Sequence, residues 1–280
     1  MRFFSKQLLQ ANKQDWSEAT YISNLGNHQW EAVENDLYYT KLVALSRNGY
    51  VSTSTDGVNW SEATYINNLG NNSWRALTYD GSQFIALSLT GYISTSTDGL
   101  SWSQASQVVS TNIADWSALA YRLLNIIAIG YRGYTSTSTN GTTWATPVKN
   151  TNLGQHEWAA IGTKYSDTPV IALSATGYLS NYTDDNSWSS ATYNSNLGNN
   201  DWVDLCYIDR FSGDDLVALS NTGYVSTSTD NGVSWSSATY NSKLGNNNWV
   251  GIRRIGGTPS IYSGKLVALS YTGYISTKRI

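Results

Sequence analysis

Residues 74–102 read WRALTYDGSQFIALSLTGYISTSTDGLSW, and this stretch decides the fold. It holds three short runs rich in apolar and β-branched residues, at 74–79, 84–88 and 92–96, with turn residues between them. Runs of this length, separated by glycine-bearing turns, predict antiparallel strands rather than helices. Trp102 marks a fourth run, so the stretch predicts a unit of four strands.

The unit recurs six times along the 280 residues. Its Gly-Tyr dipeptide repeats at spacings of 42, 42, 44, 46 and 50 residues, at Gly49-Tyr50, Gly91-Tyr92, Gly133-Tyr134, Gly177-Tyr178, Gly223-Tyr224 and Gly273-Tyr274. All 12 tryptophans fall into two series, the first at Trp30, Trp74, Trp116, Trp158, Trp202 and Trp249, the second at Trp16, Trp60, Trp102, Trp144, Trp188 and Trp235. A four-stranded repeat of about 40–45 residues is the signature of a propeller blade. The sequence therefore predicts an all-β, six-bladed β-propeller with four antiparallel strands per blade, each blade beginning near a tryptophan of the first series.

The order of strands at the two ends predicts how the ring closes. Residues 16–21 read WSEATY, which recurs at 60–65 as the fourth strand of a unit, and the chain ends on a third strand after Tyr274. The N-terminal strand should therefore complete the last blade, which leaves no open sheet edge at the junction. We expect one domain over residues 13–280, preceded by a lead segment of residues 1–12.

Composition narrows the classes of partner. The formal net charge is −3, charged residues make up 13%, and no basic stripe is present, which argues against nucleic acid and anionic membrane as partners. No apolar run is long enough to insert into a membrane, and residues 1–10 lack the apolar core of a classical signal peptide. A polar, mostly uncharged surface favours an extracellular, cell-surface or virion setting. Cys206 lies in an apolar stretch, which predicts a buried structural thiol.

The turn between the third and fourth strands carries a recognisable motif. Residues 228–235 read STDNGVSW, which resembles the Asp-box, the S-x-D-x-G-x-x-W hairpin of sialidase-like (BNR) propellers. Other copies are one residue shorter, and the copy at 183–188 also lacks the glycine. The resemblance implies a structural turn role, away from any active site, for Asp56, Asp98, Asn140, Asp184 and Asp230. One acidic residue per turn is too few for a Ca²⁺ site, so no metal is expected.

The same resemblance raises glycoside hydrolysis, which the residues argue against. Sialidases carry an arginine cluster, a tyrosine with a glutamate partner, an aspartate acid/base and an Arg-Ile-Pro segment, and that segment is absent here. The arginines are scattered over different strand positions, and the repeat-equivalent Glu18 and Glu62 are expected at an exposed outer edge rather than flanking a bond. His28 and His156 fall in equivalent loops, too far apart for one metal site. We expect no enzyme, no cofactor and no metal.

The loops that join one unit to the next repeat as faithfully as the strands, as in NLGNNSW at 68–74. Amides bond sugar hydroxyls, indole rings stack on apolar sugar faces, and several weak sites on one ring give avidity. The candidate ligand-binding residues are Trp30, Trp74, Trp116, Trp158, Trp202, Trp249, Asn27, Asn71, Asn72, Asn199, Asn200, Asn246 and Asn247. The alternative is structural: the loop leucines plug between blades, the amides satisfy loop backbone, and the tryptophans are core.

Two functions are favoured over a sialidase-like glycoside hydrolase. The first is non-catalytic, multivalent carbohydrate recognition, lectin-like, through the face that carries the loops between units. The second is a structural or protein-docking module of a virion, phage tail or surface assembly. The loops between first and second strands differ in every unit, as at 209–215 and 253–265, and favour docking of one asymmetric partner, with residues 1–12 as a tether. The oligomeric state is left open.

Overall fold

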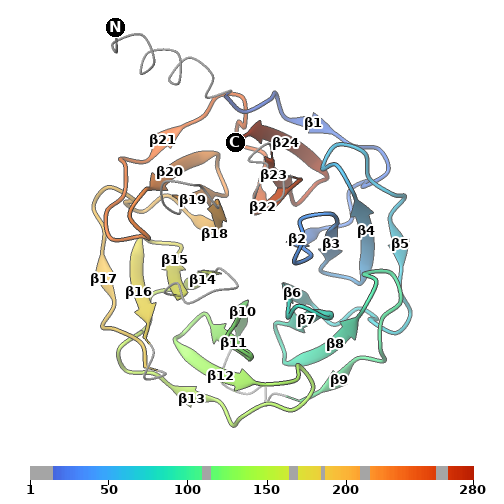
Figure 1. Ribbon diagram of the computed structural model, residues 1–280, viewed down its shortest axis with the longest axis horizontal. Coiled ribbons are helices and arrows are strands. Elements are labelled where there is room, and N and C mark those ends of the chain that lie inside the picture. Colours follow the sequence, from blue (N-terminus) through green and yellow to red (C-terminus); the bar gives the residue numbers. More distant parts are fainter. Residues whose placement is uncertain (1–14, 109–114, 164–169, 184–186, 209–214, 257–263) are drawn as a thin grey trace, which may run out of the picture.

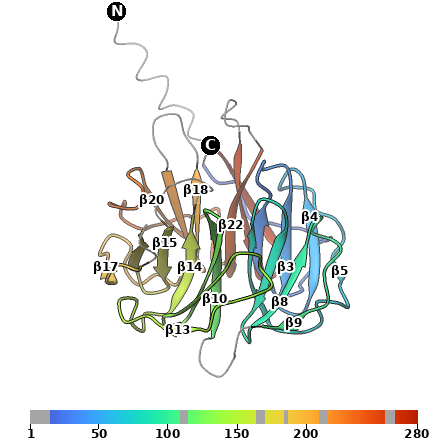
Figure 2. The same ribbon diagram turned by 60° about the horizontal axis from the view of Figure 1, so that its bottom comes forward.

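A computed structural model describes residues 15–108, 115–163, 170–183, 187–208, 215–256 and 264–280. Six four-stranded antiparallel sheets stand around a central axis, and Figure 1 looks down that axis. Figure 2 shows strands of neighbouring blades standing side by side around it. The predicted all-β, six-bladed propeller is confirmed. The described residues include no helix that could cross a membrane.

The innermost strand of each blade begins at a tryptophan of the first series: β2 (Trp30–Asn35), β6 (Trp74–Tyr79), β10 (Trp116–Arg122), β14 (Trp158–Gly162), β18 (Trp202–Ile208) and β22 (Trp249–Ile255). The second strands are β3 (Leu42–Ser46), β7 (Phe84–Ser88), β11 (Asn125–Gly130), β15 (Val170–Ser174), β19 (Asp215–Ser220) and β23 (Lys265–Ser270). We number the blades from 1, which begins with β2, to 6, which begins with β22.

The third strands begin at the Gly-Tyr tyrosines: β4 (Tyr50–Ser54), β8 (Tyr92–Ser96), β12 (Tyr134–Ser138), β16 (Tyr178–Tyr182), β20 (Tyr224–Ser228) and β24 (Tyr274–Arg279). The outermost strands have two residues each: β1 (Thr20–Tyr21), β5 (Thr64–Tyr65), β9 (Ser106–Gln107), β13 (Val148–Lys149), β17 (Thr192–Tyr193) and β21 (Thr239–Tyr240). They begin four residues after the tryptophan that was expected to mark them, because serine hydroxyls replace part of the ladder before that point. In blade 2, for example, Ser94 Oγ donates to Ser103 O at 2.6 Å.

The ring closes as predicted. The last sheet has the order β1-β24-β23-β22, with Thr20 opposite Ile275 and Tyr21 opposite Tyr274. Ser276 Oγ donates to Ser17 O at 2.6 Å, repeating across the junction the serine bond found within the other blades. The lead segment of residues 1–12 lies outside the described residues, so its boundary stays a prediction.

The hydrophobic core lies between adjacent blades rather than inside each one. One cluster joins Val43 and Leu45 of blade 1 to Trp74 and Phe84 of blade 2, and the loop residue Leu69 plugs the gap with no exposed surface. Equivalent clusters surround the ring. Each blade therefore buries its apolar faces only when both neighbours are present.

The Asp-box-like turns also join blades. Asp98 Oδ1 accepts hydrogen bonds from the backbone N–H groups of Leu100 and Ser101 at 2.8 and 2.7 Å, and Ser96 Oγ accepts the N–H of Gly99. Gly99 (φ +77°) packs so closely on Val43 of the preceding blade that a Cβ would lie 2.5 Å from Val43 Cγ2. Asp56, Asn140 and Asp230 make equivalent turn bonds, and Asp184 lies outside the described residues.

A β-bulge at the start of every innermost strand shapes the channel. The register shifts just after the tryptophan in all six blades. The residue before each tryptophan has positive φ, between 42° and 60°: Gln29, Ser73, Asp115, Glu157, Asp201 and Asn248. Bulges re-aim side chains. Here the bulged positions, which include Glu31 and Arg75, line the channel.

Candidate functional site at the mouth of the central channel

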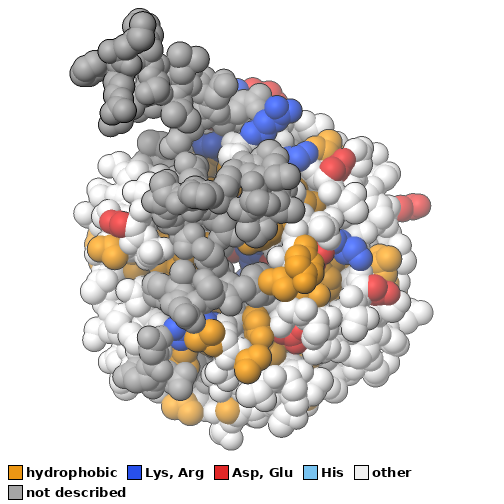
Figure 3. All heavy atoms as spheres, viewed as in Figure 1, with side chains coloured by type: hydrophobic (Ala, Val, Ile, Leu, Met, Phe, Trp, Pro, Cys, Tyr) orange, Lys and Arg blue, Asp and Glu red, His pale blue; other side chains and the backbone are white. Residues whose placement is uncertain are grey.

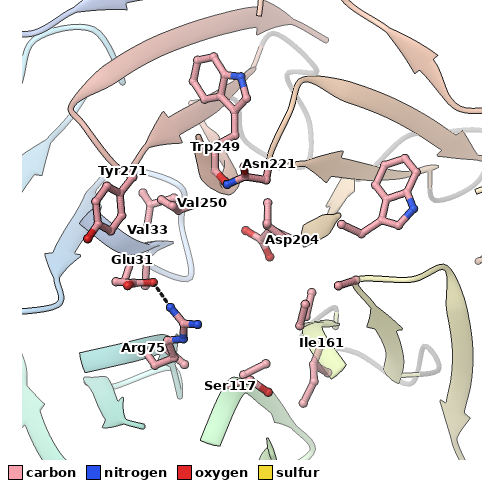
Figure 4. Close-up of a pocket in the computed structure, with 18 of the residues that line it drawn as sticks. Glu31, Val33, Arg75, Ser117, Ile161, Asp204, Asn221, Trp249, Val250 and Tyr271 are labelled. Carbon is pink, nitrogen blue, oxygen red and sulfur yellow. Dashed lines mark hydrogen bonds and ion pairs between the residues drawn. The ribbon is translucent and has the colours of Figure 1, made fainter. Parts of the chain in front are cut away.

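A cavity of about 640 Å³ opens where the innermost strands converge. Its mouth lies on the face that carries the loops between blades, because its lining includes residues directly before innermost strands, such as Glu157, and directly after second strands, such as Tyr271. Figure 4 shows Glu31, Arg75 and Asp204 pointing toward the opening from three blades, whereas Trp249 points away from it. The volume falls within the range of pockets that hold small molecules or peptide side chains.

Arginines of blades 1 and 2 make one side of the mouth cationic. Arg75 Nη1 lies 2.5 Å from Glu31 Oε2, and Arg47 Nε lies 3.5 Å from Glu31 Oε1. Burial raises the pKa of the Glu31 carboxyl, while Arg75 and Arg47 act in the opposite direction. The Glu31 side chain is 7% exposed, whereas Arg47 and Arg75 are 38% and 30% exposed. Two partly exposed guanidinium groups sharing one buried carboxylate leave a net positive charge facing the cavity.

Acidic residues occupy the opposite side of the mouth. Glu157 and Asp201 are exposed and precede the innermost strands of blades 4 and 5, which stand across the ring from blades 1 and 2. Tyr131 lies close enough to both walls for their charges to shift the pKa of its phenol. Burial raises the pKa of its phenol, Glu157 and Asp201 raise it further, and Arg75 lowers it. The mouth is therefore polar, aromatic and charged with opposite signs on opposite walls.

A buried ion cluster lies below the mouth. Arg253 of β22 contacts Glu34 Oε1 of β2 at 3.1 Å and Asp204 Oδ2 of β18 at 2.5 Å, so it links three consecutive blades. Asp204 also accepts the backbone N–H groups of Ile252 and Leu205, both at 2.8 Å. Burial raises the pKa values of Glu34 and Asp204 because it disfavours the charged carboxylates, whereas Arg253 acts in the opposite direction on both. In Figure 4, Asp204 lies across the opening from Glu31 and Arg75.

Cys206 lies beside this cluster. Burial raises the pKa of its thiol to about 12, so it is a buried thiol with little thiolate character. This agrees with the packing role that the sequence predicts.

The tryptophans singled out as ligand-binding candidates are inside the protein. Trp30, Trp74, Trp116, Trp158, Trp202 and Trp249 are all 0% exposed. The indole N–H of Trp74 donates to Gly70 O at 3.2 Å, and Trp30, Trp202 and Trp249 make the equivalent bond. No face of these rings is open for a sugar to stack on, so their burial supports the packing alternative.

The loop amides divide into two groups. Asn72, Asn200 and Asn247 each donate Nδ2 to the carbonyl of the loop leucine three residues earlier, at 2.6 Å, and so close their own loops. Asn27, Asn71, Asn199 and Asn246 are exposed, which leaves their amides open to solvent on the same face as the channel mouth. The repeated loop predicts ligand binding by both groups of asparagines, and only the exposed group has amides open to a ligand.

The two histidines occupy the same loop position as the loop-closing amides. His28 stacks on Tyr50 with ring centroids 3.9 Å apart, and His156 stacks on Tyr178 at 3.8 Å. They stand in blades 1 and 4, on opposite sides of the ring. Among the described residues, no three His, Cys, Asp or Glu side chains gather as metal ligands.

The charged channel residues were not singled out from the sequence. The position after the first-series tryptophan reads Glu31, Arg75, Ser117, Ala159, Val203 and Val250. It differs between nearly all copies, whereas most other strand positions repeat. The sequence does mark the channel residues, because they occupy a position at which the repeat breaks down. A search for recurrent residues passes over such a position.

The fold defines the class of the chain, a six-bladed β-propeller, and comparisons with known proteins agree. No protein-family model and no curated protein matches it. Among solved structures it is similar to YCF48 from Cyanidioschyzon merolae, with 17% identity, a TM-score of 0.56 and coverage of 90% of this chain and 83% of that one. A structure of YCF48 bound to D1 peptide has 16% identity, a TM-score of 0.58 and coverage of 94% and 96%. The Neurospora crassa Pan2 WD40 domain has 7% identity, a TM-score of 0.57 and 96% coverage of both chains. Likeness at these identities shows the fold, and the Asp-box likeness of the turns stays a resemblance.

Proposed function

We propose that this propeller is a non-catalytic binding module that holds a segment of a partner protein at the mouth of its central channel. The observation that carries the proposal is the cavity of about 640 Å³, in which blades contribute different side chains. A site without six-fold symmetry suits one ligand in one orientation. Guanidinium groups on one wall and carboxylates on the other suit a polar peptide, whose backbone and charged side chains offer both signs.

The state of the channel carboxylates supports a role without catalysis. A glycosidase needs two carboxyl groups that flank the scissile bond, one to donate a proton and one to attack or activate water. Glu31 is held by Arg75 and Arg47, and Glu34 and Asp204 are held by Arg253. These buried carboxylates are engaged with arginine rather than directed at a substrate.

The structural neighbours support the proposal at the level of fold. One of them is YCF48 bound to D1 peptide, so a propeller of similar shape holds a peptide. At 16% identity this is an analogy between folds and assigns no residue of the present chain a role.

A displayed library of random peptides tests the proposal. Peptides enriched on the wild-type protein should bind the double variant Arg47→Ala, Tyr271→Ala at least about tenfold more weakly, the loss expected for removing contacts at the centre of a site. Glu62→Ala, at an exposed position on the outer edge, is the matched control and should bind like wild type. The proposal fails if no peptide is enriched, or if the double variant holds the enriched peptides as tightly as the control does.

Carbohydrate recognition is the second candidate, favoured by a different observation. Asn27, Asn71, Asn199 and Asn246 are exposed and repeat-equivalent, and only 13% of the chain is charged. Figure 3, which shows one face of the ring, has its Lys, Arg, Asp and Glu side chains mostly separated by uncharged surface. An extracellular or virion setting suits both candidates and remains a prediction, and neither candidate requires a cofactor.

A further inference from the structure

Four of the six outermost strands end in an exposed tyrosine. Tyr21, Tyr65, Tyr193 and Tyr240 are 48%, 43%, 53% and 52% exposed, at equivalent positions in blades 6, 1, 4 and 5. Large aromatic side chains are normally buried over most of their surface, because each removes about 150–250 Å² from water when it packs. Half-exposed rings at the same register in four blades call for an explanation beyond the folding of one strand.

Each exposed ring is held in place by a second tyrosine. Tyr21, Tyr65, Tyr193 and Tyr240 lie directly opposite Tyr274, Tyr50, Tyr178 and Tyr224 of the neighbouring strand. Ring centroids are 5.4–5.5 Å apart and the planes meet at 58–62°. The inner tyrosines are only partly exposed and pack against the core. The cross-strand contact therefore fixes the outer ring, while about half of its surface remains in solvent.

The surroundings of the pairs are mainly polar, with few charged residues: Glu18, Glu62 and Lys243 each lie three residues from an outer tyrosine. Each outer tyrosine follows an exposed threonine: Thr20, Thr64, Thr192 or Thr239. An aromatic face of this kind stacks on the apolar C–H face of a pyranose, and phenol and threonine hydroxyls bond its hydroxyl groups. Asp15 and Lys243 form one ion pair at 3.5 Å between the blade 5 and blade 6 sites, and the low density of charge around the other sites favours a neutral ligand.

The two remaining blades lack the aromatic pair. Gln107 of blade 2 stands opposite Tyr92 and donates Nε2 to Thr90 O at 3.2 Å. Lys149 of blade 3 stands opposite Tyr134, with Nζ 5.0 Å from the ring centroid. The four tyrosine pairs consequently occupy one continuous arc, β17, β21, β1 and β5 in Figure 1. The fold accepts glutamine or lysine at this position, so tyrosine there is not required for packing.

We propose that the four tyrosine pairs are saccharide sites that bind a neutral polysaccharide along this arc. Four small, equivalent sites spaced around a rigid ring fit a ligand that itself repeats, whereas one protein partner would require a single contiguous patch. Each site alone is weak, and simultaneous occupation raises the apparent affinity by about 10²-fold or more. The inference rests on the second candidate function, adds a set of residues to the loop asparagines, and does not depend on any ligand in the channel.

Glutamine substitutions test the sites with little risk to folding, because blade 2 already carries glutamine in this register. The wild-type protein should be retained on at least one of four immobilised neutral polysaccharides: glucan, mannan, galactan and chitin. Replacing Tyr21, Tyr65, Tyr193 and Tyr240 together with glutamine should weaken retention about 100-fold, and a single replacement only several-fold. Gln107→Tyr should add a fifth site and strengthen retention.

Two further proteins keep the test decisive. The channel variant Arg47→Ala, Tyr271→Ala should bind polysaccharide like wild type, so loss of peptide binding and loss of sugar binding are separable. If the fourfold variant melts early, the Gln107→Tyr gain and the single variants carry the test. Lack of retention of the wild-type protein on all four polysaccharides overturns the proposal. Equal retention of wild type and fourfold variant overturns it too, as does a change from oligomer to monomer in the fourfold variant without any sugar binding.

Discussion

The third strands of this propeller are alike in sequence from blade to blade, whereas the innermost strands differ at the position that faces the channel. Strands β4, β8 and β20 read YVSTS, YISTS and YVSTS, nearly the same residues in three blades. The channel-facing position of the innermost strands carries instead a glutamate in blade 1, an arginine in blade 2 and a valine in blade 5. Third-strand residues are fixed by packing and hydrogen bonds that every blade must make. The channel position has no such shared role, so it is where a six-fold chain can hold a unique site.

The largest expected effect comes from the channel. Arg253→Met leaves Glu34 and Asp204 buried without the cation that links them, and should lower the free energy of unfolding by about 3–5 kcal/mol in urea denaturation. Adding Glu34→Gln and Asp204→Asn should restore most of this loss, because no unpaired charge then remains. Arg132→Met is the control: its side chain is 63% exposed and its ion pair with Asp115 should contribute less than about 1 kcal/mol. Equal losses for Arg253 and Arg132 would show that the cluster is not a stabilising link between blades.

The contacts between blades rank second. Gly99→Ala places a Cβ 2.5 Å from Val43 Cγ2, a buried and stiff side chain, and also strains the backbone at φ +77°. Gly81→Ala, at φ +95°, meets nothing within 4 Å and carries the backbone strain alone. We expect a loss of about 1–2 kcal/mol for Gly81→Ala and about 1–2 kcal/mol more for Gly99→Ala, measured by denaturant midpoints. Indistinguishable midpoints would mean that the turn glycine is needed only for its conformation, not for the approach of neighbouring blades.

Two asparagines of one loop allow a structural amide to be compared with an exposed one, with smaller expected changes in unfolding free energy. Asn68 Nδ2 donates to Trp102 O at 2.8 Å and so ties the loop to the next blade, and Asn24, Asn152 and Asn196 make the same bond. Asn68→Ala should cost about 1 kcal/mol of unfolding free energy. Asn71→Ala, three residues on and exposed, should change it by less than about 0.5 kcal/mol. A similar loss at both positions would contradict the division of the loop into structural and available amides.

The same comparison explains which features of the fold and the site could be predicted from the sequence. Strand order, blade number and ring closure were all predictable, because Trp74, Gly91 and their equivalents recur for reasons that every blade shares. The exposure of a recurrent residue was not predictable, since Trp74 and Asn71 sit in one repeated loop and end up buried and exposed, respectively. The channel residues were missed because repetition itself was the signal being sought, and they are the positions that do not repeat.

The smallest expected effect is on the pH dependence of folding stability, whose sign should differ between the blade turns and the channel. The backbone N–H of Ser101 is the main cause that lowers the pKa of Asp98 to about 2, well below its value in the unfolded chain. Asp98 therefore stabilises the fold above pH about 4, and this contribution is lost as the pH falls toward about 2. Asn140 makes the same turn bonds without a charge, so Asp98→Asn should keep the turn and flatten the acid dependence by less than about 1 kcal/mol, given its solvent exposure.

Glu34 has a raised pKa, because burial disfavours its charged form more than Arg253 favours it. Its contribution is complete at pH values below about 4.3, the pKa of an unperturbed glutamate, and declines as the pH rises through the folded value. Glu34→Gln should therefore flatten the stability profile above pH about 4.3, whereas Asp98→Asn flattens it below pH about 4. Urea titrations at a series of pH values measure both slopes. If both variants flattened the profile on the same side, the pKa values of Asp98 and Glu34 would be shifted in the same direction. That result would contradict the contrast between blade turns and channel.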